Sequence, residues 1–301
     1  MENNAPPIRT APTQHFLFVG GGLGDVARRF YLSDTYELLS TLTEPTSVIC
    51  FSHNPSARDF FRFHPNHRNI VLFDLGHIYM SFLRDPLIDK RKINQMLFSL
   101  CGFADADGLA RQREPKPIGL FFAPDALTGV SNHIVVHPFG RAWGNWPRET
   151  VELVKAALRT VPPAVQIYVI CADYIAADGR VKREGFSSDQ ANVKVLRNLS
   201  APAVFSLVAT ASRFIGNLSS LAQVAAFERV PSVIIHPERC SDFKVPYSDY
   251  AKTIWKANGI NLSYETTEST ALTETLNRFF KDSPANINVR EISPTLPDKT
   301  N

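Results

Sequence analysis

The feature that most constrains this chain is an apolar strand that runs into a glycine loop and then into a helix, at residues 15–25. The loop at residues 20–24 reads GGGLG, and Asp25 follows it directly. A second strand, tight turn and helix start lies at residues 213–220. A loop of small residues between a strand and a helix lets backbone N–H groups approach a phosphate. The two units therefore predict two nucleotide-binding halves with one ligand between them.

Composition narrows the class of protein. With 301 residues, 44% of them hydrophobic and 20% charged, the chain has the length and balance of a globular protein of two domains. We expect no membrane span, because no apolar run approaches ~20 residues. Residues 1–12 lack the basic and apolar regions of a signal peptide. The four cysteines form no CxxC pair, so we expect reduced thiols and a cytoplasmic protein.

The charge of the chain is modest. The formal net charge is +3, and lysine and arginine are scattered, with residues 90–92 the only compact basic cluster. This balance permits an anionic ligand. It shows no basic patch typical of a nucleic-acid-binding protein, although a nucleic acid is not excluded as an acceptor.

Strands and helices alternate along the chain, which is the pattern of parallel sheets covered by helices. Residues 124–132 are rich in proline, glycine and polar residues and are interpreted as a linker. We therefore expect a Rossmann-like N-terminal domain on the acceptor side at residues 14–130. A second Rossmann-like domain, which binds the nucleotide sugar, is expected at residues 133–281. The tails at residues 1–12 and 282–301 are expected to be flexible.

The same pattern predicts the individual elements. In the N-terminal domain we expect strands at residues 15–19, 47–52, 69–75 and 118–123, a helix from Asp25 to residue 42, and a helix at residues 85–103. In the C-terminal domain we expect strands at residues 133–137, 165–172, 192–196, 213–216 and 232–236, and helices at residues 148–160, 201–211, 219–228 and 267–280.

Three blocks of sequence together resemble glycosyltransferase family 9, the heptosyltransferases. The blocks are Gly22-Leu23-Gly24-Asp25; HPFG at residues 137–140 followed by Trp146-Pro147; and FIGNLSSLAQVAA at residues 214–226 ending in VPSV at residues 230–233. Their order and spacing are similar to the family's over roughly residues 14–240. The chain departs from the family pattern at Gly144, Leu218 and Gln223, where the family has lysine, aspartate and often histidine.

The resemblance implies a GT-B-like α/β fold, in which two Rossmann-type domains with parallel sheets face each other across a cleft. It also implies a metal-independent glycosyltransferase that moves a sugar from a nucleotide-diphosphate donor to a hydroxyl of a glycan or another acceptor. No cofactor is expected beyond this nucleotide sugar. In similar proteins the last helix, here at residues 267–280, returns to pack on the N-terminal domain. The three departures remove the inference that the donor is ADP-heptose.

Asp25 is the candidate general base. It follows the glycine loop at the carboxyl end of a strand, where such sheets place their sites. The resemblance places the family's catalytic aspartate at the same position. A helix cap is the structural alternative for this carboxylate, and the two roles are compatible. Gly21, Gly22 and Gly24 form the loop that lets backbone N–H groups approach a phosphate.

Arg141, Asn217, Ser219 and Ser220 form the candidate donor site. The guanidinium of Arg141 suits a diphosphate and can replace the lysine missing at Gly144. Ser219 and Ser220 open a helix, so their hydroxyl and N–H groups can bind a phosphate, although one serine can equally serve as a plain N-cap. Asn217 belongs to the block that resembles the family.

Several other signals are interpreted as structural. His137 ends a strand, and Trp146 precedes a proline at a helix start, so we expect both to pack. The Asp105-Ala106-Asp107 string lies in a polar loop after a predicted helix, and we expect no metal site there or elsewhere.

Two alternatives to the glycosyltransferase stay open. The first is a dinucleotide-dependent oxidoreductase, motivated by the glycine loop alone. The second predicted strand ends in Ser52-His53, however, where such enzymes carry a ribose-binding acid. The second alternative is a non-catalytic GT-B-like binding protein, motivated by Leu218 and Gly144 in place of the family's acid and lysine.

Overall fold

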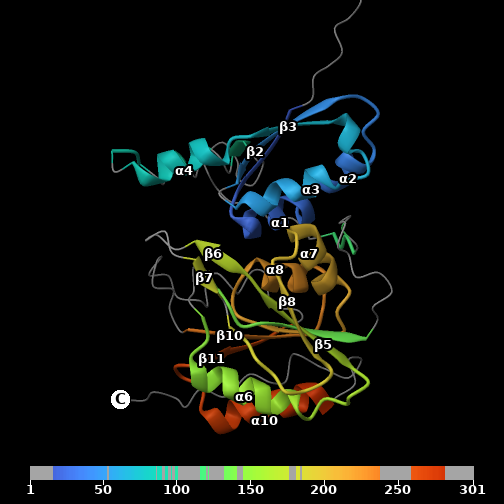
Figure 1. Cartoon of the computed structure of the whole chain (residues 1–301). Helices are drawn as coiled ribbons and strands as arrows, with labels where there is room; N and C mark the ends of the chain where they lie inside the picture. The colour runs from blue at the N-terminus through green and yellow to red at the C-terminus, as the bar shows by residue number, and fades with distance from the viewer. Residues whose placement is uncertain are drawn as a thin grey trace, which may run out of the picture.

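The chain folds into two separate parallel sheets with helices packed on them, as a computed structural model shows (Figure 1). The predicted α/β class with two parallel sheets is confirmed. We call residues 16–121 the N-terminal half and residues 132–281 the C-terminal half; the domain boundaries themselves stay a prediction. The structure describes residues 16–52, 54–85, 87–89, 92–93, 96, 99–100, 116–119, 121, 132–140, 145–175, 181–183, 185–237 and 259–281.

The N-terminal half contains a three-stranded sheet in the order β1-β2-β3, with all strands parallel. Its strands are β1 (Phe16–Gly21), β2 (Thr46–Ser52) and β3 (Ile70–Asp74). Its helices are α1 (Leu23–Tyr31), α2 (Thr35–Ser40), α3 (Asp59–Arg62) and α4 (Gly76–Arg84), with short 3-10 turns at Pro55–Arg58 and His67–Asn69.

The C-terminal half contains a six-stranded parallel sheet in the order β11-β10-β9-β4-β5-β8. Its strands are β4 (His133–His137), β5 (Gln166–Cys171), β8 (Val193–Arg197), β9 (Arg213–Gly216), β10 (Ser232–His236) and β11 (Gly259–Ser263). Its helices are α6 (Arg148–Leu158), α7 (Ala201–Ala209), α8 (Ser220–Phe227) and α10 (Ser269–Lys281). Strands β6 (Asp173–Ile175) and β7 (Val181–Arg183) form an antiparallel pair that the sequence did not predict.

Both faces of the C-terminal sheet are covered. Phe214 and Ile234 point to the layer of α7 and α8, while their neighbours Ile215 and Ile235 point to the layer of α6 and α10 (Figure 1). Side chains alternate across a strand, so an uninterrupted apolar strand needs a helix layer on each side. The predicted strands at residues 133–137, 213–216 and 232–236 are confirmed to the residue.

The two halves share one hydrophobic cluster, because α1 contacts α8 and α3 contacts α7. Aromatic rings form much of this contact. The ring centroids of Tyr31 and Phe227 lie 5.0 Å apart, and those of Phe60 and Phe205 lie 4.9 Å apart. Such pairs add specific ring contacts to the burial of apolar area. The helices between the sheets therefore hold the halves together.

The predicted helix from Asp25 to residue 42 is wrong in its length. The structure has two helices, and α1 already ends at Tyr31. The hydroxyl of Ser33 donates to the carbonyl oxygen of Arg29 and also bonds the hydroxyl of Thr35. Serine and aspartate side chains compete in this way for backbone groups that a continuous helix needs.

The predicted strand at residues 118–123 is wrong in its described part, because Ile118, Gly119 and Phe121 lie outside any strand. The Glu228 carboxylate accepts hydrogen bonds from the Ile118 and Gly119 amides, at 2.7 and 2.8 Å. The Phe121 amide donates to the hydroxyl of Ser206, and that hydroxyl donates to the Phe121 carbonyl. Side chains of the C-terminal half thus occupy the backbone groups that a sheet ladder would use.

The last helix does not return to the N-terminal half. Helix α10 contacts α6, and its Leu272, Leu276 and Phe279 belong to the core on that side of the C-terminal sheet (Figure 1). The expectation drawn from similar proteins is therefore wrong, because the apolar stripe of α10 is buried within its own half.

Two other predictions lie wholly or partly outside the described residues. The linker at residues 124–132 is described only at Asn132. Within the predicted helix at residues 85–103, the described residues Lys92, Ile93, Met96, Ser99 and Leu100 are helical. No helix in the described ranges is long and apolar enough to cross a membrane.

Candidate functional site

The junction between β1 and α1 holds the Asp25 carboxylate against the glycine loop. Gly22 is the N-cap of α1, and its N–H donates to Asp25 Oδ2 at 2.9 Å. Gly21 has φ +88°, and a Cβ at this residue would lie 2.4 Å from Asp25 Oδ2. The helix begins at Leu23, so Asp25 caps it from the first turn. The capping role considered for this residue is therefore present.

Asp25 is half-buried, and burial raises the pKa of its carboxyl group above the ordinary value. The hydrogen bond from Gly22 and the positive charge of Arg28 partly oppose this rise in pKa. A carboxylate with a raised pKa holds a proton more readily than a free aspartate does. Because Oδ2 accepts from the Gly22 amide, proton exchange at Oδ1 leaves this hydrogen bond in place.

The junction between β9 and α8 is built differently. Its N-cap is Ser219, whose hydroxyl accepts from the Ala222 amide at 3.4 Å, and Ser220 is the first residue of the helix. Asn217 is fully buried, and its side-chain oxygen accepts from the Leu218 amide. The first amides of a helix have no acceptor within it and carry partial positive charge. This end of α8 can therefore bind an anion as well as cap itself.

Two histidines flank that junction at the carboxyl ends of the neighbouring strands. His137 ends β4, and its Nδ1 lies 3.2 Å from the Ser219 hydroxyl oxygen. His236 ends β10 on the other side of β9, and its Nδ1 lies 2.6 Å from the Pro237 carbonyl oxygen. Burial lowers the pKa of both rings to about 4, so both are neutral at pH 7.

The two junctions meet where Gly24 faces Gln223. A Cβ at Gly24 would lie 2.9 Å from Gln223 Nε2, in the first turn and a half of α8. A side chain at Gly24 would displace the flexible end of Gln223, so α1 and α8 lie close together here. The contact brings the Asp25 loop of one half beside the first turns of α8 in the other half.

The end of β2 bears on the oxidoreductase alternative. Ser52 is buried, and its hydroxyl donates to the Gly21 carbonyl at 2.8 Å. A dinucleotide fold needs an acidic side chain there for the ribose. In this chain the residue at the strand end, Ser52, instead forms a hydrogen bond with the glycine loop, and no acidic residue stands there to bind a ribose.

Leu218 departs from the family pattern in a way that the structure explains. Its side chain is 2% exposed and belongs to the cluster shared by the two halves. An aspartate at this position would bury a charge among apolar groups. Where the family pattern has an aspartate, the loop before α8 thus has a leucine that packs between the two halves.

Several predicted site residues lie outside the described ranges. These are Arg141, Gly144 and the string at residues 105–107. Among the described residues, no group of three or more His, Cys, Asp or Glu could hold a metal ion. Trp146 is a packing residue, as interpreted: it is 5% exposed, and its indole N–H donates to the Ile235 carbonyl at 2.7 Å.

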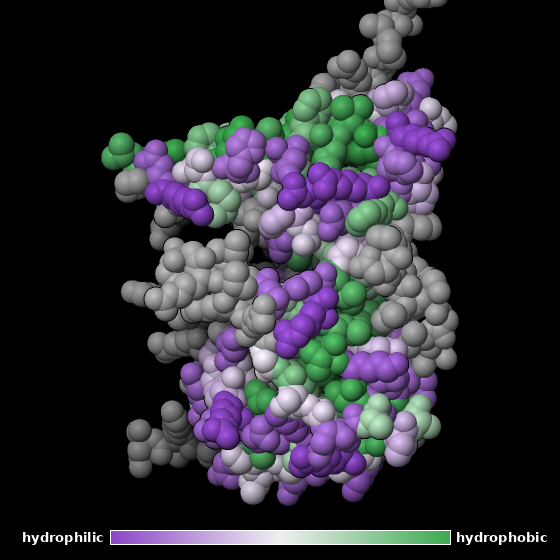
Figure 2. Space-filling view, in the orientation of Figure 1, coloured by the Kyte–Doolittle hydropathy of each residue, from purple (hydrophilic) through white to green (hydrophobic). Residues whose placement is uncertain are grey.

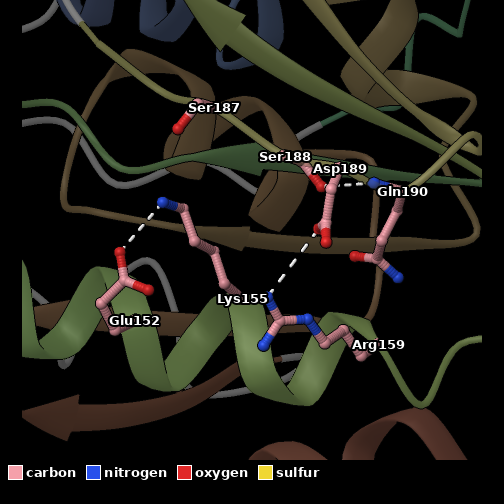
Figure 3. A pocket seen from close by; sticks show the side chains of 7 residues that line it. All are labelled: Glu152, Lys155, Arg159, Ser187, Ser188, Asp189 and Gln190. Atoms are coloured by element: carbon pink, nitrogen blue, oxygen red, sulfur yellow. Dashed lines mark hydrogen bonds and ion pairs between the residues drawn. The ribbon is translucent and has the colours of Figure 1, made fainter.

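A pocket of about 390 Å³ lies elsewhere, on the side of the C-terminal sheet that carries α6 (Figure 3). Its charges are paired with one another: Lys155 lies 3.0 Å from Glu152, and Arg159 lies 3.8 Å from Asp189. The pocket is lined by Glu152, Lys155, Arg159, Ser187, Ser188, Asp189 and Gln190. No group from either loop lines it, so we place the candidate site at the junctions.

Sequence reasoning missed the positions of Gln223 and His236 and undervalued His137. In the sequence, Gln223 stands out only as a departure from the family pattern. The signal for both histidines is the same: an apolar strand, at residues 133–137 or 232–236, ends in histidine. Polar residues at the carboxyl ends of parallel strands gather at one edge of the sheet.

Comparison with known proteins gives structural likeness only. No family model matches the sequence, and no curated protein matches it. Heptosyltransferase II of E. coli is similar in structure, at 15% identity and a TM-score of 0.49, over 89% of this chain and 99% of that chain. E. coli heptosyltransferase WaaC with ADP is similar at 10% identity and a TM-score of 0.49, over 88% and 99%.

A glycosyl transferase of family 9 from Veillonella parvula is also similar, at 11% identity and a TM-score of 0.39, over 92% of this chain and 96% of that chain. The sequence blocks resemble the same family. The chemistry of the site rests on this chain's own residues.

Proposed function

We propose that this protein is a metal-independent glycosyltransferase that uses a nucleotide-diphosphate sugar. The observation that carries the proposal is the Asp25 carboxyl, with its raised pKa, held beside the amino end of α8 by the contact of Gly24 with Gln223. The blocks that resemble family 9 include both junctions. A base at the junction of β1 and α1 and an anion-binding helix end at the junction of β9 and α8 suit transfer from a phosphorylated donor.

Asp25 acts as the general base in this scheme. Its carboxylate takes the proton of an acceptor hydroxyl as the acceptor oxygen bonds to the anomeric carbon of the sugar. The bond from that carbon to the diphosphate oxygen breaks, and the nucleoside diphosphate leaves with the electron pair. The acceptor is a glycan or another compound with a hydroxyl group.

The C-terminal half binds the donor. The amides at the start of α8 and the hydroxyls of Ser219 and Ser220 meet the diphosphate, where negative charge grows during transfer. Arg141 supplies the cation, which in the family pattern is a lysine at the position of Gly144. Replacing Arg141 with alanine is expected to weaken donor binding by about 1.5–3 kcal/mol.

The test begins with a thermal-shift screen of ADP-, UDP-, GDP- and TDP-sugars, followed by transfer assays with the donor that binds. Asp25→Asn is expected to bind the donor normally and to lose about 10²–10⁴-fold in turnover, because an amide cannot accept the proton. Asp59→Asn, an aspartate in the first turn of α3, is the matched control. Normal transfer by Asp25→Asn would remove Asp25 from the chemistry.

A non-catalytic binding protein is the second candidate, and the burial of Leu218 favours it. The position of the family's acid then serves packing, and the donor site serves recognition alone. Donor binding without transfer to any acceptor, by the wild type as by Asp25→Asn, would support this candidate over the first.

A further inference from the structure

The N-terminal sheet has one apolar face that the described residues cover only in part. Side chains of Val19, Val48 and Cys50 point to the shared cluster, so their neighbours along each strand point the other way. The register places Phe18 beside Ile49 and Ile49 beside Phe73 on that outer side. We call the residues Phe18, Ile49, Phe51, Val71 and Phe73 the outer face.

The outer face is exposed where it reaches the edge strand. Phe73 is 47% exposed and Val71 is 45% exposed on β3. The rings of Phe18 and Phe51 stack with their centroids 6.2 Å apart. Strands that are apolar on both sides belong to sheets covered on both faces. The apolar residues on the outer side of these strands therefore indicate a surface that packs against something, and the described residues bury it only in part.

Exposed apolar residues continue onto α4 and onto the described residues beyond it up to Leu100, which together we call the arm. Helix α4 extends sideways from the sheet (Figure 1). Ile78 and Phe82 are four residues apart and form an exposed stripe on α4. Leu87 is 92% exposed, and Met96 and Leu100 are exposed further along. Figure 2 shows hydrophobic residues gathered over the N-terminal sheet, on the side away from the C-terminal half, and along this arm.

The stretch of sequence that carries most of these apolar residues has a surplus of basic residues. Residues 53–100 contain seven lysines and arginines against four aspartates, a surplus equal to the whole chain's net charge of +3. Arg84 and Lys92 are exposed on the arm itself. Residues 84–92 contain four lysines and arginines against two aspartates, Asp85 and Asp89. Apolar side chains flanked by basic ones are the two signals that together hold a protein at an anionic membrane surface.

We propose that the outer face and the arm dock on the surface of an anionic phospholipid bilayer. Phe82, Leu87 and the outer face enter the boundary between head groups and acyl chains, and Arg84 and Lys92 meet the lipid phosphates. A second copy of the chain fits less well, because two such basic surfaces would face each other. The proposal is independent of the proposed function, since none of these residues belongs to the two junctions.

The experiment measures binding of the full chain to vesicles of phosphatidylcholine with and without phosphatidylglycerol. The wild type is expected to sediment with the anionic vesicles and to dissociate in about 1 M salt, where the Debye length falls to about 3 Å. The double variant Phe82→Asp/Leu87→Asp is expected to lose at least about tenfold in partitioning, since two apolar contacts are replaced by repelled charges. The matched control is Leu38→Asp, because Leu38 on α2 is 42% exposed, as Phe82 is.

A second pair of variants separates the two signals. Arg84→Gln/Lys92→Gln is expected to weaken binding to the anionic vesicles about tenfold or less and to leave any binding to neutral vesicles unchanged. Light scattering reports the oligomeric state of each variant. The proposal is overturned if the wild type does not bind anionic vesicles, or if Leu38→Asp loses as much binding as the double variant. It is also overturned if the wild type is a dimer and Phe82→Asp/Leu87→Asp is a monomer.

Discussion

The two sheets of this protein are built from similar strands but have different surroundings. In the C-terminal sheet, β9 and β10 are buried along their whole length, between α7 and α8 on one side and α6 and α10 on the other. In the N-terminal sheet, β2 alternates between buried and half-buried residues, and β3 alternates between half-buried and exposed ones. Among the described residues, an apolar strand therefore has a complete cover in one half and a complete cover on at most one side in the other.

This difference teaches where the stability and the surface chemistry of the chain reside. The covered face of the N-terminal sheet packs into a cluster that includes α7 and α8, so that half depends on the C-terminal half for its core. Its other face is covered only in part by the described residues. The C-terminal sheet has no such face among the described residues, and its polar groups gather at the strand ends near the candidate site.

The largest expected effect comes from truncating one phenylalanine in each sheet. Phe214 on β9 is fully buried, so Phe214→Ala is expected to lower the free energy of unfolding by about 3–5 kcal/mol. Phe73 on β3 is 47% exposed, so Phe73→Ala is expected to cost less than about 1 kcal/mol. Urea denaturation measures both. Equal losses would mean that the outer face is covered in solution, and the comparison between the sheets would fail.

An intermediate effect is expected from acid. Burial, followed by the charge of His67, lowers the pKa of His64 in the N-terminal half to about 4, and burial lowers the pKa of His236 in the C-terminal half to about 4. The unfolded chain has ordinary histidine pKa values near 6.5, so it binds more protons than the native state between these limits. The stabilisation is complete above pH ~6.5 and is lost as the pH falls towards 4, by up to roughly 3 kcal/mol for each ring.

Two single variants turn this acid effect into a test of the halves. His64→Gln and His236→Gln should each flatten the fall in unfolding free energy between pH 7 and pH 4.5, because each removes one titrating ring. Since the halves share a core, we expect one cooperative transition in both variants. Two separate transitions, each sensitive to one variant, would show that the halves unfold independently.

The smallest effect is expected at the glycine loop. Gly21→Ala places a Cβ at φ +88° and 2.4 Å from Asp25 Oδ2, which should cost about 1–3 kcal/mol and displace the carboxylate. Gly24→Ala meets only the flexible end of Gln223, so its cost should stay below about 1 kcal/mol. Denaturation midpoints measure both variants. A larger loss in Gly24→Ala would show that the α1–α8 contact is tighter than the strain at Gly21.

Much of the C-terminal half could be predicted because its strands are continuous apolar runs bounded by polar residues. β4, β9 and β10 have the predicted bounds. β11 was missed, because its sequence GINLS mixes polar and apolar residues and only alternate side chains are buried. A strand that is buried on one face shows only alternating apolar residues, and here that alternation is limited to five residues with two apolar side chains, Ile260 and Leu262.

At the candidate site, the sequence determined the local chemistry. A glycine loop followed by Asp25 places a carboxylate at the end of a strand and at the start of a helix, and Asn217 to Ser220 place a polar turn before α8. These are consequences of short stretches, because capping and turn geometry depend on neighbours in the sequence.

Only the tertiary structure decided which of these stretches meet. The contact of Gly24 with Gln223, the pairing of His137 with Ser219 and the burial of Leu218 all join residues that are distant in the sequence. The same holds for α10, which packs within the C-terminal half, and for the partly covered outer face. An apolar pattern specifies that a surface prefers to leave water, but its partner is selected by the packing of the whole chain.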